Sequence, residues 1–376
     1  MKCELLISNH SKLAGIEDYI KVIKKIFKKN NVLFDVVNTV SEEVDLLFLI
    51  EEFVTPPKKF SKSLNYYKKK GIKLCLIHTE FIDKNKFFNI FSSKDLFFRK
   101  IIFADLLLFL YKKNFIYSII FYFMTGCYLI YGKLFFNFNL IEIKKRIYFA
   151  MRDRAFSCFS HLFNYHICLS DNLFNCLKNN FDQKNIVYLQ HYINSSFINS
   201  IKKSSNQTLI YMSGYKTKYR HNKLKKIDKK KFHNFHINRN FNIKDYQLYI
   251  NKKSRFNLIF SEEFKIRKIC KHYNEIFDIN IEKIELYISQ RKDWPYLSSM
   301  RIIRSLENSS IPVNLGKYSN SSYDKLCLNF NSMDELIKNY EFQREKYIEG
   351  LPEILNEFNR MSDTLFKNFY KNVIDN

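Results

Sequence analysis

Short apolar runs alternate with segments of helical periodicity along the first eighty residues. Continuous apolar runs each predict a strand buried on both faces of a sheet, at 2–9, 32–40, 44–53 and 72–81. Between the first two runs, apolar residues recur at three- and four-residue spacing and predict an amphipathic helix over 16–31: Ile16, Ile20, Ile23 and Phe27. A proline-started helix, closed by Gly71, is predicted over 56–71.

The same alternation continues further along the chain. Residues 141–162 predict a helix, 165–180 a strand followed by a helix, and 185–194 another strand. The polar segment 195–208, rich in Ser and Asn, is the best candidate for a domain boundary.

A second series of strands and helices follows this boundary. A strand is predicted at 209–214, ended by Gly214, and a strongly basic helix at 216–231. Further strands are predicted at 232–238, 255–264, 283–289, 311–316 and 325–330. Helices close the chain from residue 332, with Ser332 as N-cap and Glu335 completing a capping box.

The predicted fold class is therefore α/β, with two Rossmann-like domains that face each other across a cleft, followed by C-terminal helices. The first domain spans 1–200 and carries an apolar helical insertion near 96–150, the second spans 207–331, and the helical tail spans 332–376. In open parallel sheets ligands bind at the carboxyl ends of the strands, so we expect the chemistry in the loops that follow strands.

The net charge of the chain indicates which kind of partner to expect. The 376 residues carry a formal net charge of +25, which favours an anionic partner, and the inner face of a membrane more than DNA. The alternative explanation of the net charge is an AT-rich genome, in which lysine fills generic surface positions. The hydrophobic content of 46% provides for real cores and excludes a wholly disordered chain.

The cysteines and the N-terminus indicate a reducing compartment. The eight cysteines include no CxxC pair, and several lie inside apolar runs, so we interpret them as buried apolar residues. The first fifteen residues contain too short an apolar stretch for a signal peptide. We therefore expect a cytoplasmic protein.

One segment complicates this expectation. Residues 115–132 contain no charge and are flanked by Lys112, Lys113 and Lys133. The segment is close to the roughly 20 apolar residues that span a bilayer. Three interpretations remain open: a buried helix pair, a membrane-surface or re-entrant hairpin, and a true span.

The stretch 293–313, DWPYLSSMRIIRSLENSSIPV, has the strongest chemical pattern in the chain. Ser298 and Ser299 can cap a helix that begins near Met300, and Arg301 and Arg304 fall on one face of it. A diphosphate there would meet backbone N–H groups, hydroxyls and guanidinium groups. Trp294 could pack on a base or sugar. Glu307 could accept hydrogen bonds from ribose or form an ion pair with Arg304, and the arginines could equally belong to a solvated helical face.

The pattern Trp-Pro, Ser-x-x-Arg, Arg-x-Leu-Glu and then IPV resembles the C-terminal donor-binding half of GT-B glycosyltransferases. In that superfamily a short helix with Arg or Glu precedes a G-x-P-V strand and contacts the nucleotide sugar. Here Ser309 and Ser310 stand where the usual glycine would be. The run LIYMSGYKTKYRHNKLKKI is similar to the first strand and glycine turn of the same half. This resemblance places Gly214 and Arg220 near the donor phosphates.

The N-terminal half supplies candidates for acid–base chemistry. The run CLIHTEFIDKNKFFNIF is similar to a strand and loop of bacterial envelope-polysaccharide transferases. His78 and Glu80 lie two apart in it, on one face of an extended segment, and either could deprotonate an acceptor hydroxyl. The alternative is that both are polar loop residues or caps.

The sequence thus predicts a metal-independent glycosyltransferase of bacterial surface polysaccharide or lipopolysaccharide synthesis, at the inner face of the cytoplasmic membrane. Its expected partners are a nucleotide sugar, a glycan or lipid-linked acceptor, and the membrane surface through 101–136 and the basic helix 216–231. We expect no cofactor and no metal, because neither GxGxxG, DxD nor a zinc-spaced Cys/His motif occurs, and no specific nucleic acid, because no RNP-like, KH or OB signature occurs. The alternative function is a non-catalytic basic protein that binds RNA or an anionic membrane surface.

Overall fold

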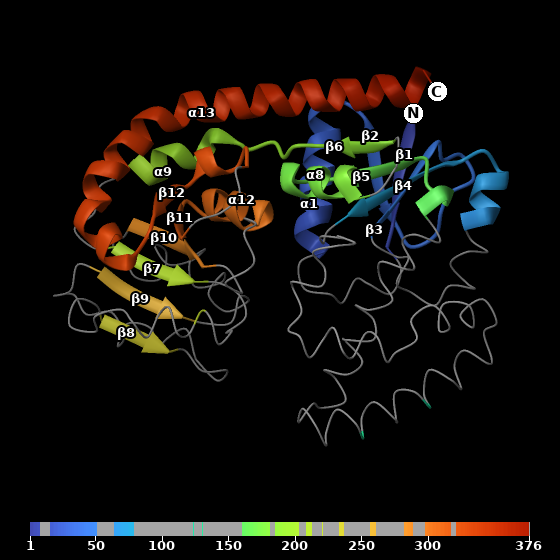
Figure 1. Cartoon of the computed structure of the whole chain (residues 1–376). Helices are drawn as coiled ribbons and strands as arrows, with labels where there is room; N and C mark the ends of the chain where they lie inside the picture. The colour runs from blue at the N-terminus through green and yellow to red at the C-terminus, as the bar shows by residue number, and fades with distance from the viewer. Residues whose placement is uncertain are drawn as a thin grey trace. The chain divides into compact units, whose positions relative to one another are not determined.

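The chain is an α/β protein with two parallel sheets and a long C-terminal helix (Figure 1). The computed structural model describes residues 1–7, 16–50, 64–78, 123, 130, 160–180, 185–202, 208–212, 220, 233–236, 256–260, 282–288, 298–316 and 321–375. These residues divide into two compact units. Unit 1 comprises 1–190 and 365–376, and unit 2 comprises 191–364.

Unit 1 contains a six-stranded parallel sheet in the order β2-β1-β3-β4-β5-β6. Its strands are β1 (Lys2–Leu6), β2 (Leu33–Val37), β3 (Leu46–Ile50), β4 (Lys73–His78), β5 (Tyr165–Cys168) and β6 (Ile186–Tyr188). The helices α1 (Ile16–Lys29) and α8 (Asp171–Asn180) and the 3₁₀ turn Ser160–Leu162 accompany them. Every strand predicted here is confirmed, each shorter than its apolar run.

The packing of unit 1 explains why α1 is amphipathic. Phe27, on its apolar face, lies 4.7 Å from Phe34 of β2 and 5.3 Å from Phe48 of β3, measured between ring centroids. The helix before β4 ends at Lys69, and Gly71 closes the turn that follows with a φ of +79°, a left-handed conformation that glycine adopts without strain. The predicted glycine closure is therefore confirmed.

Unit 2 contains a second six-stranded parallel sheet, in the order β12-β11-β10-β7-β9-β8. Its strands are β7 (Thr208–Met212), β8 (His233–His236), β9 (Phe256–Phe260), β10 (Glu282–Tyr287), β11 (Ile311–Leu315) and β12 (Leu328–Phe330). The helices α9 (Ile198–Lys202), α12 (Ser299–Glu307) and α13 (Met333–Asp375) and the 3₁₀ turns Ser195–Phe197 and Asp324–Leu326 complete the described elements. All six strands predicted after the polar segment 195–208 are found in this sheet.

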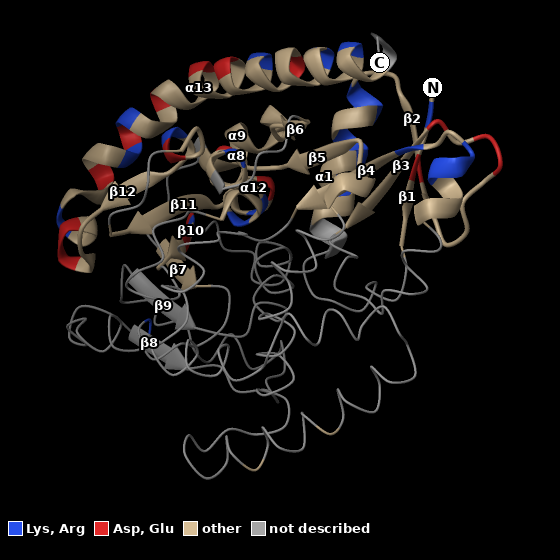
Figure 2. Cartoon of the chain, turned by 45° about the vertical axis from the view of Figure 1, so that its right-hand side comes forward, with Lys and Arg blue, Asp and Glu red and all other residues tan. Residues whose placement is uncertain are grey.

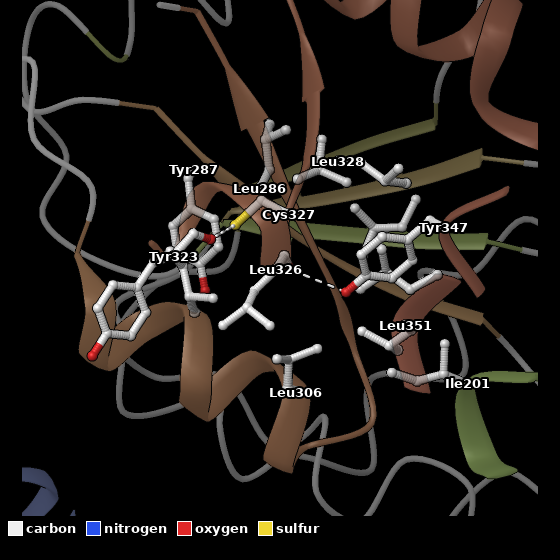
Figure 3. Packing of buried hydrophobic residues seen from close by; sticks show 14 of the residues in the cluster. Ile201, Leu286, Tyr287, Leu306, Tyr323, Leu326, Cys327, Leu328, Tyr347 and Leu351 are labelled. Atoms are coloured by element: carbon white, nitrogen blue, oxygen red, sulfur yellow. Dashed lines mark hydrogen bonds between the residues drawn. The ribbon is translucent and has the colours of Figure 1, made fainter. Parts of the chain in front are cut away.

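Residues 195–202 are helical and contribute to a core. Phe197, Ile198 and Ile201 are buried among the apolar side chains of β10, β11 and α13. Figure 3 shows part of this cluster, in which the Tyr347 hydroxyl donates to the Leu326 carbonyl at 3.0 Å. Because the segment is mostly polar, its three apolar residues at helical spacing were not predicted to form a buried helix.

The C-terminal helices predicted from residue 332 form one helix, α13, of 43 residues with Pro352 inside it. The capping box is confirmed in part: the Glu335 N–H donates to Ser332 Oγ at 3.2 Å. The Glu335 carboxylate accepts from the N–H of Asn331 at 2.8 Å, one residue before the expected partner. The helix begins in unit 2, and its last residues belong to unit 1.

Candidate functional site

The strand order of unit 2 reverses between β7 and β10. These strands are neighbours in the sheet, although β8 and β9 lie between them in the sequence. In open parallel sheets a ligand typically binds outside the carboxyl ends of the strands at such a reversal. The residues that follow β7 and β10 are therefore the natural place to look for a site.

Arg220 follows β7 and is hydrogen-bonded at the end of β10. It is 3% exposed, and its Nε donates to the Ile288 carbonyl at 2.8 Å. A guanidinium group carries five N–H donors in a planar fork, which suits it to hold backbone carbonyls and anionic groups. Gly214, which the resemblance places beside it, lies outside the described residues.

The first turn of α12 is attached to the same end of β10. The Tyr287 hydroxyl donates to the Arg301 carbonyl at 2.6 Å. Burial, reinforced by the nearby Glu285 carboxyl, raises the pKa of Tyr287 well above its usual range, so this hydroxyl keeps its proton. Arg220 and Arg301 are thus held by consecutive residues of one strand end.

The start of α12 differs by one residue from the prediction. The helix begins at Ser299, and Ser298 is its N-cap, without a side-chain capping hydrogen bond. Ser298 is exposed and Ser299 is buried. The first turn carries no acidic side chain, so the partial positive charge of the helix start adds to that of Arg301.

His191 also contacts the first turn of α12, through Met300. Its Nε2 lies 2.9 Å from the Met300 sulfur and its Nδ1 lies 2.5 Å from the Tyr323 hydroxyl. A thioether sulfur only accepts, so we assign the proton to Nε2, and the Tyr323 hydroxyl then donates to Nδ1. Neither His191 nor Tyr323 is recognisable from the sequence, because their partners lie more than a hundred residues away.

Arg304 has a different environment from Arg301. Its Nη2 lies 3.4 Å from Oε1 of Glu285, a β10 residue whose side chain is 1% exposed. The other oxygen of this carboxylate accepts from the Tyr211 hydroxyl at 3.3 Å, and that hydroxyl also lies 2.9 Å from Ser310 Oγ. Arg304 therefore anchors α12 to the sheet, whereas Glu307 is exposed at the last residue of the helix.

In unit 1, His78 lies at the carboxyl end of β4 and is fully buried. Its Nε2 lies 3.1 Å from Nδ1 of His166 on β5, and Nε2 of His166 lies 3.2 Å from the Ser160 carbonyl. Because a carbonyl only accepts, we assign the proton of His166 to Nε2, and its Nδ1 then accepts from His78. Burial lowers the pKa of His166 to about 4. Glu80, the other candidate base, and Trp294 lie outside the described residues.

The prediction that the cysteines are buried is confirmed for the cysteines that the structure describes. Cys3, Cys75, Cys168, Cys176 and Cys327 are free and buried. Burial raises the pKa values of Cys75, Cys168 and Cys327 well above their usual range, so these thiols are poor nucleophiles. Among the described residues, no three His, Cys, Asp or Glu side chains group as metal ligands.

Within the described part of the chain, no helix has the length and apolar character needed to cross a membrane. Of residues 115–132, only Phe123 and Ile130 are described. Both are helical, with 71% and 64% of their surfaces exposed. The remainder of this segment and the basic segment 216–231, apart from Arg220, lie outside the described residues.

Comparison with known proteins assigns no family: neither a protein-family model nor a curated protein matches this sequence.

Proposed function

We propose that this protein is a glycosyltransferase of the GT-B type, which transfers a sugar from a nucleotide-sugar donor to a glycan or lipid-linked acceptor in bacterial surface polysaccharide synthesis. Unit 2 would bind the donor and unit 1 the acceptor. The transfer of the sugar would take place at the inner face of the cytoplasmic membrane.

One observation carries the proposal. Arg220 and the first turn of α12 are both bonded to the end of β10, next to the point where the strand order reverses. A donor diphosphate bound there would meet the N–H groups of a helix start and the guanidinium group of Arg301. Such groups stabilise the charge that develops on a departing nucleotide, and they do so without a metal.

The structure changes the roles we propose for some residues. Arg301, Arg220 and Ser298 remain the candidates for contact with phosphate, while Arg304 positions α12 through Glu285. His78 would act as base only if the acceptor reached its Nδ1, the nitrogen that does not face His166. Glu80, two residues further on, is the other candidate.

The test of donor binding is a thermal shift experiment with UDP, GDP and CMP. We expect one nucleotide to raise the unfolding temperature of the full chain. Arg301→Ala should weaken its binding roughly tenfold or more, the usual effect of losing a charge-assisted hydrogen bond. The matched control is Arg360→Ala, which removes an exposed arginine from α13 and should leave the affinity unchanged.

A transfer or hydrolysis assay across nucleotide sugars, performed with and without EDTA, then tests the reaction. Turnover of one donor, unaffected by EDTA, supports a metal-independent transferase. If no nucleotide binds, while RNA or any other polyanion binds with strong salt dependence and Arg301→Ala has no effect, the chain is a binding protein and the proposal is wrong.

A further inference from the structure

After its first turn, which contains Glu17 and Asp18, α1 carries only lysine among its charged residues. Five lysines recur at spacings of one, three and four residues and are all exposed: Lys21, Lys24, Lys25, Lys28 and Lys29. The opposite face, including Ile23 and Phe27, is buried against the sheet. From residue 19 to residue 34 the sequence contains no acidic residue.

The last turns of α13 extend this basic surface. Phe366 of α13 packs edge-on against Phe27 of α1, with ring centroids 5.1 Å apart. Lys367 and Lys371, one turn apart on the same helix, are exposed. Figure 2 shows the lysines of both helices in blue where the end of α13 lies beside α1. We call these seven lysines, together with Leu33, the lysine edge.

Leu33 adds an apolar element to the lysine edge. It follows α1 after a short turn, begins the edge strand β2, and is 59% exposed. Acidic residues flank this stretch in the sequence: Glu17 and Asp18 precede the lysines in α1, Asp35, Glu42, Glu43 and Asp45 follow them, and Asp363 lies one turn before Lys367 on α13. Asp45 accepts from the Lys2 N–H at 2.6 Å.

We propose that the lysine edge docks on the surface of an anionic phospholipid bilayer. Lysine is a hydrated point charge on a long apolar stem, which suits diffuse attraction to many headgroups. Each lysine near an anionic bilayer contributes appreciably to binding, and an exposed leucine beside them can enter the interface.

The same residues fit nucleic acid less well. Single-stranded nucleic acid is typically held by exposed aromatic rings on which bases stack. Among the described aromatic side chains of α1, β2 and the last turns of α13, Tyr19, Phe34 and Tyr370 are half-buried, and Phe27, Phe366 and Phe369 are buried. Neither α1 nor the last turns of α13 after Arg360 contain an arginine, although arginine is the residue favoured for recognition of nucleic-acid phosphate.

Sedimentation of the full chain with vesicles tests the proposal. The vesicles contain phosphatidylcholine alone or a mixture with phosphatidylglycerol. We expect binding only to the mixture, weakened by salt. The triple variant Lys24→Gln, Lys28→Gln and Lys371→Gln should lose affinity on the order of 100-fold. The matched control, Lys68→Gln, Lys69→Gln and Lys70→Gln, removes three exposed lysines from the helix before β4 and should retain binding within about twofold.

Leu33→Ser provides a second measurement that does not depend on the folding of the triple variant. It should weaken vesicle binding and leave the binding of polyuridylic acid unchanged. Equal binding to both kinds of vesicle, or equal losses in the two triple variants, would overturn the proposal. Tight binding of polyuridylic acid that needs the same lysines and ignores Leu33 would assign the edge to nucleic acid instead. These outcomes are independent of nucleotide-sugar turnover.

Discussion

At the scale of single residues, two arginines one helical turn apart have different roles because their neighbours differ. Arg304 reaches Glu285, a carboxylate inside unit 2, whereas the carbonyl of Arg301 is bonded to Tyr287 at the end of β10. An unpaired buried carboxylate is costly, so the position of Arg304 is determined by Glu285. The sequence shows the spacing of the arginines but not the carboxylate opposite one of them.

His166 leads to a pH prediction at the same scale. Burial lowers its pKa to about 4, below its value of roughly 6.5 in an unfolded chain. Protons then bind the unfolded state more tightly. The contribution of His166 is therefore fully present above about pH 6.5 and is lost as the pH falls toward 4.

We expect the free energy of unfolding to fall by about 2 kcal/mol through His166 between about pH 6.5 and about pH 4.5. Urea unfolding of the wild type and of His166→Asn, across this range, measures the difference in slope. His161→Asn changes an exposed histidine nearby and should retain the wild-type slope. Identical slopes for His166→Asn and the wild type would contradict the prediction.

At the scale of elements, the turn from α12 into β11 holds a serine in a backbone conformation that glycine favours. Ser309 has a φ of +54°, in the left-handed region that glycine favours. The N–H of the next residue, Ser310, donates to the Ser305 carbonyl and closes the helix. A serine thus adopts the backbone conformation that a glycine would adopt more easily.

Ser309→Gly should therefore raise the free energy of unfolding by about 0.5 to 1 kcal/mol, because relief of the left-handed conformation exceeds the added entropy of the unfolded glycine. Chemical denaturation measures the change. Ser298→Gly, at a φ of −88° at the other end of the same helix, should be neutral or slightly destabilising. A loss of stability in Ser309→Gly would show that the serine side chain, and not the backbone, determines this turn.

At the scale of the whole molecule, α13 contributes to the cores of both units. Leu336, Tyr340 and Leu351 are buried in unit 2, and Phe366 and Phe369 in unit 1. Phe369 packs edge-on against Tyr165 of β5, with ring centroids 5.8 Å apart. Unit 1 therefore depends on the last residues of the chain as well as on the first.

Phe369→Ala should destabilise unit 1 by about 3 kcal/mol or more, the usual cost of emptying a buried aromatic site. Hydrogen exchange of the β4 and β5 amides measures this loss within unit 1. Phe342→Ala serves as the control, because Phe342 lies on the same helix with 57% of its surface exposed. Unchanged protection of β4 and β5 in Phe369→Ala would contradict this account of unit 1.

The sequence by itself determined the strands, their parallel arrangement and the starts of α1 and α12 to within a residue, because burial on both faces and helical periodicity are local patterns. It also singled out the stretch from Ser298 to Arg304 as a candidate site for phosphate. Tertiary structure alone decided that Arg304 pairs with Glu285, that Arg220 binds Ile288, and that His78 meets His166. Each of these contacts joins residues separated by at least 19 positions, and only the folding of the sheets brings them together.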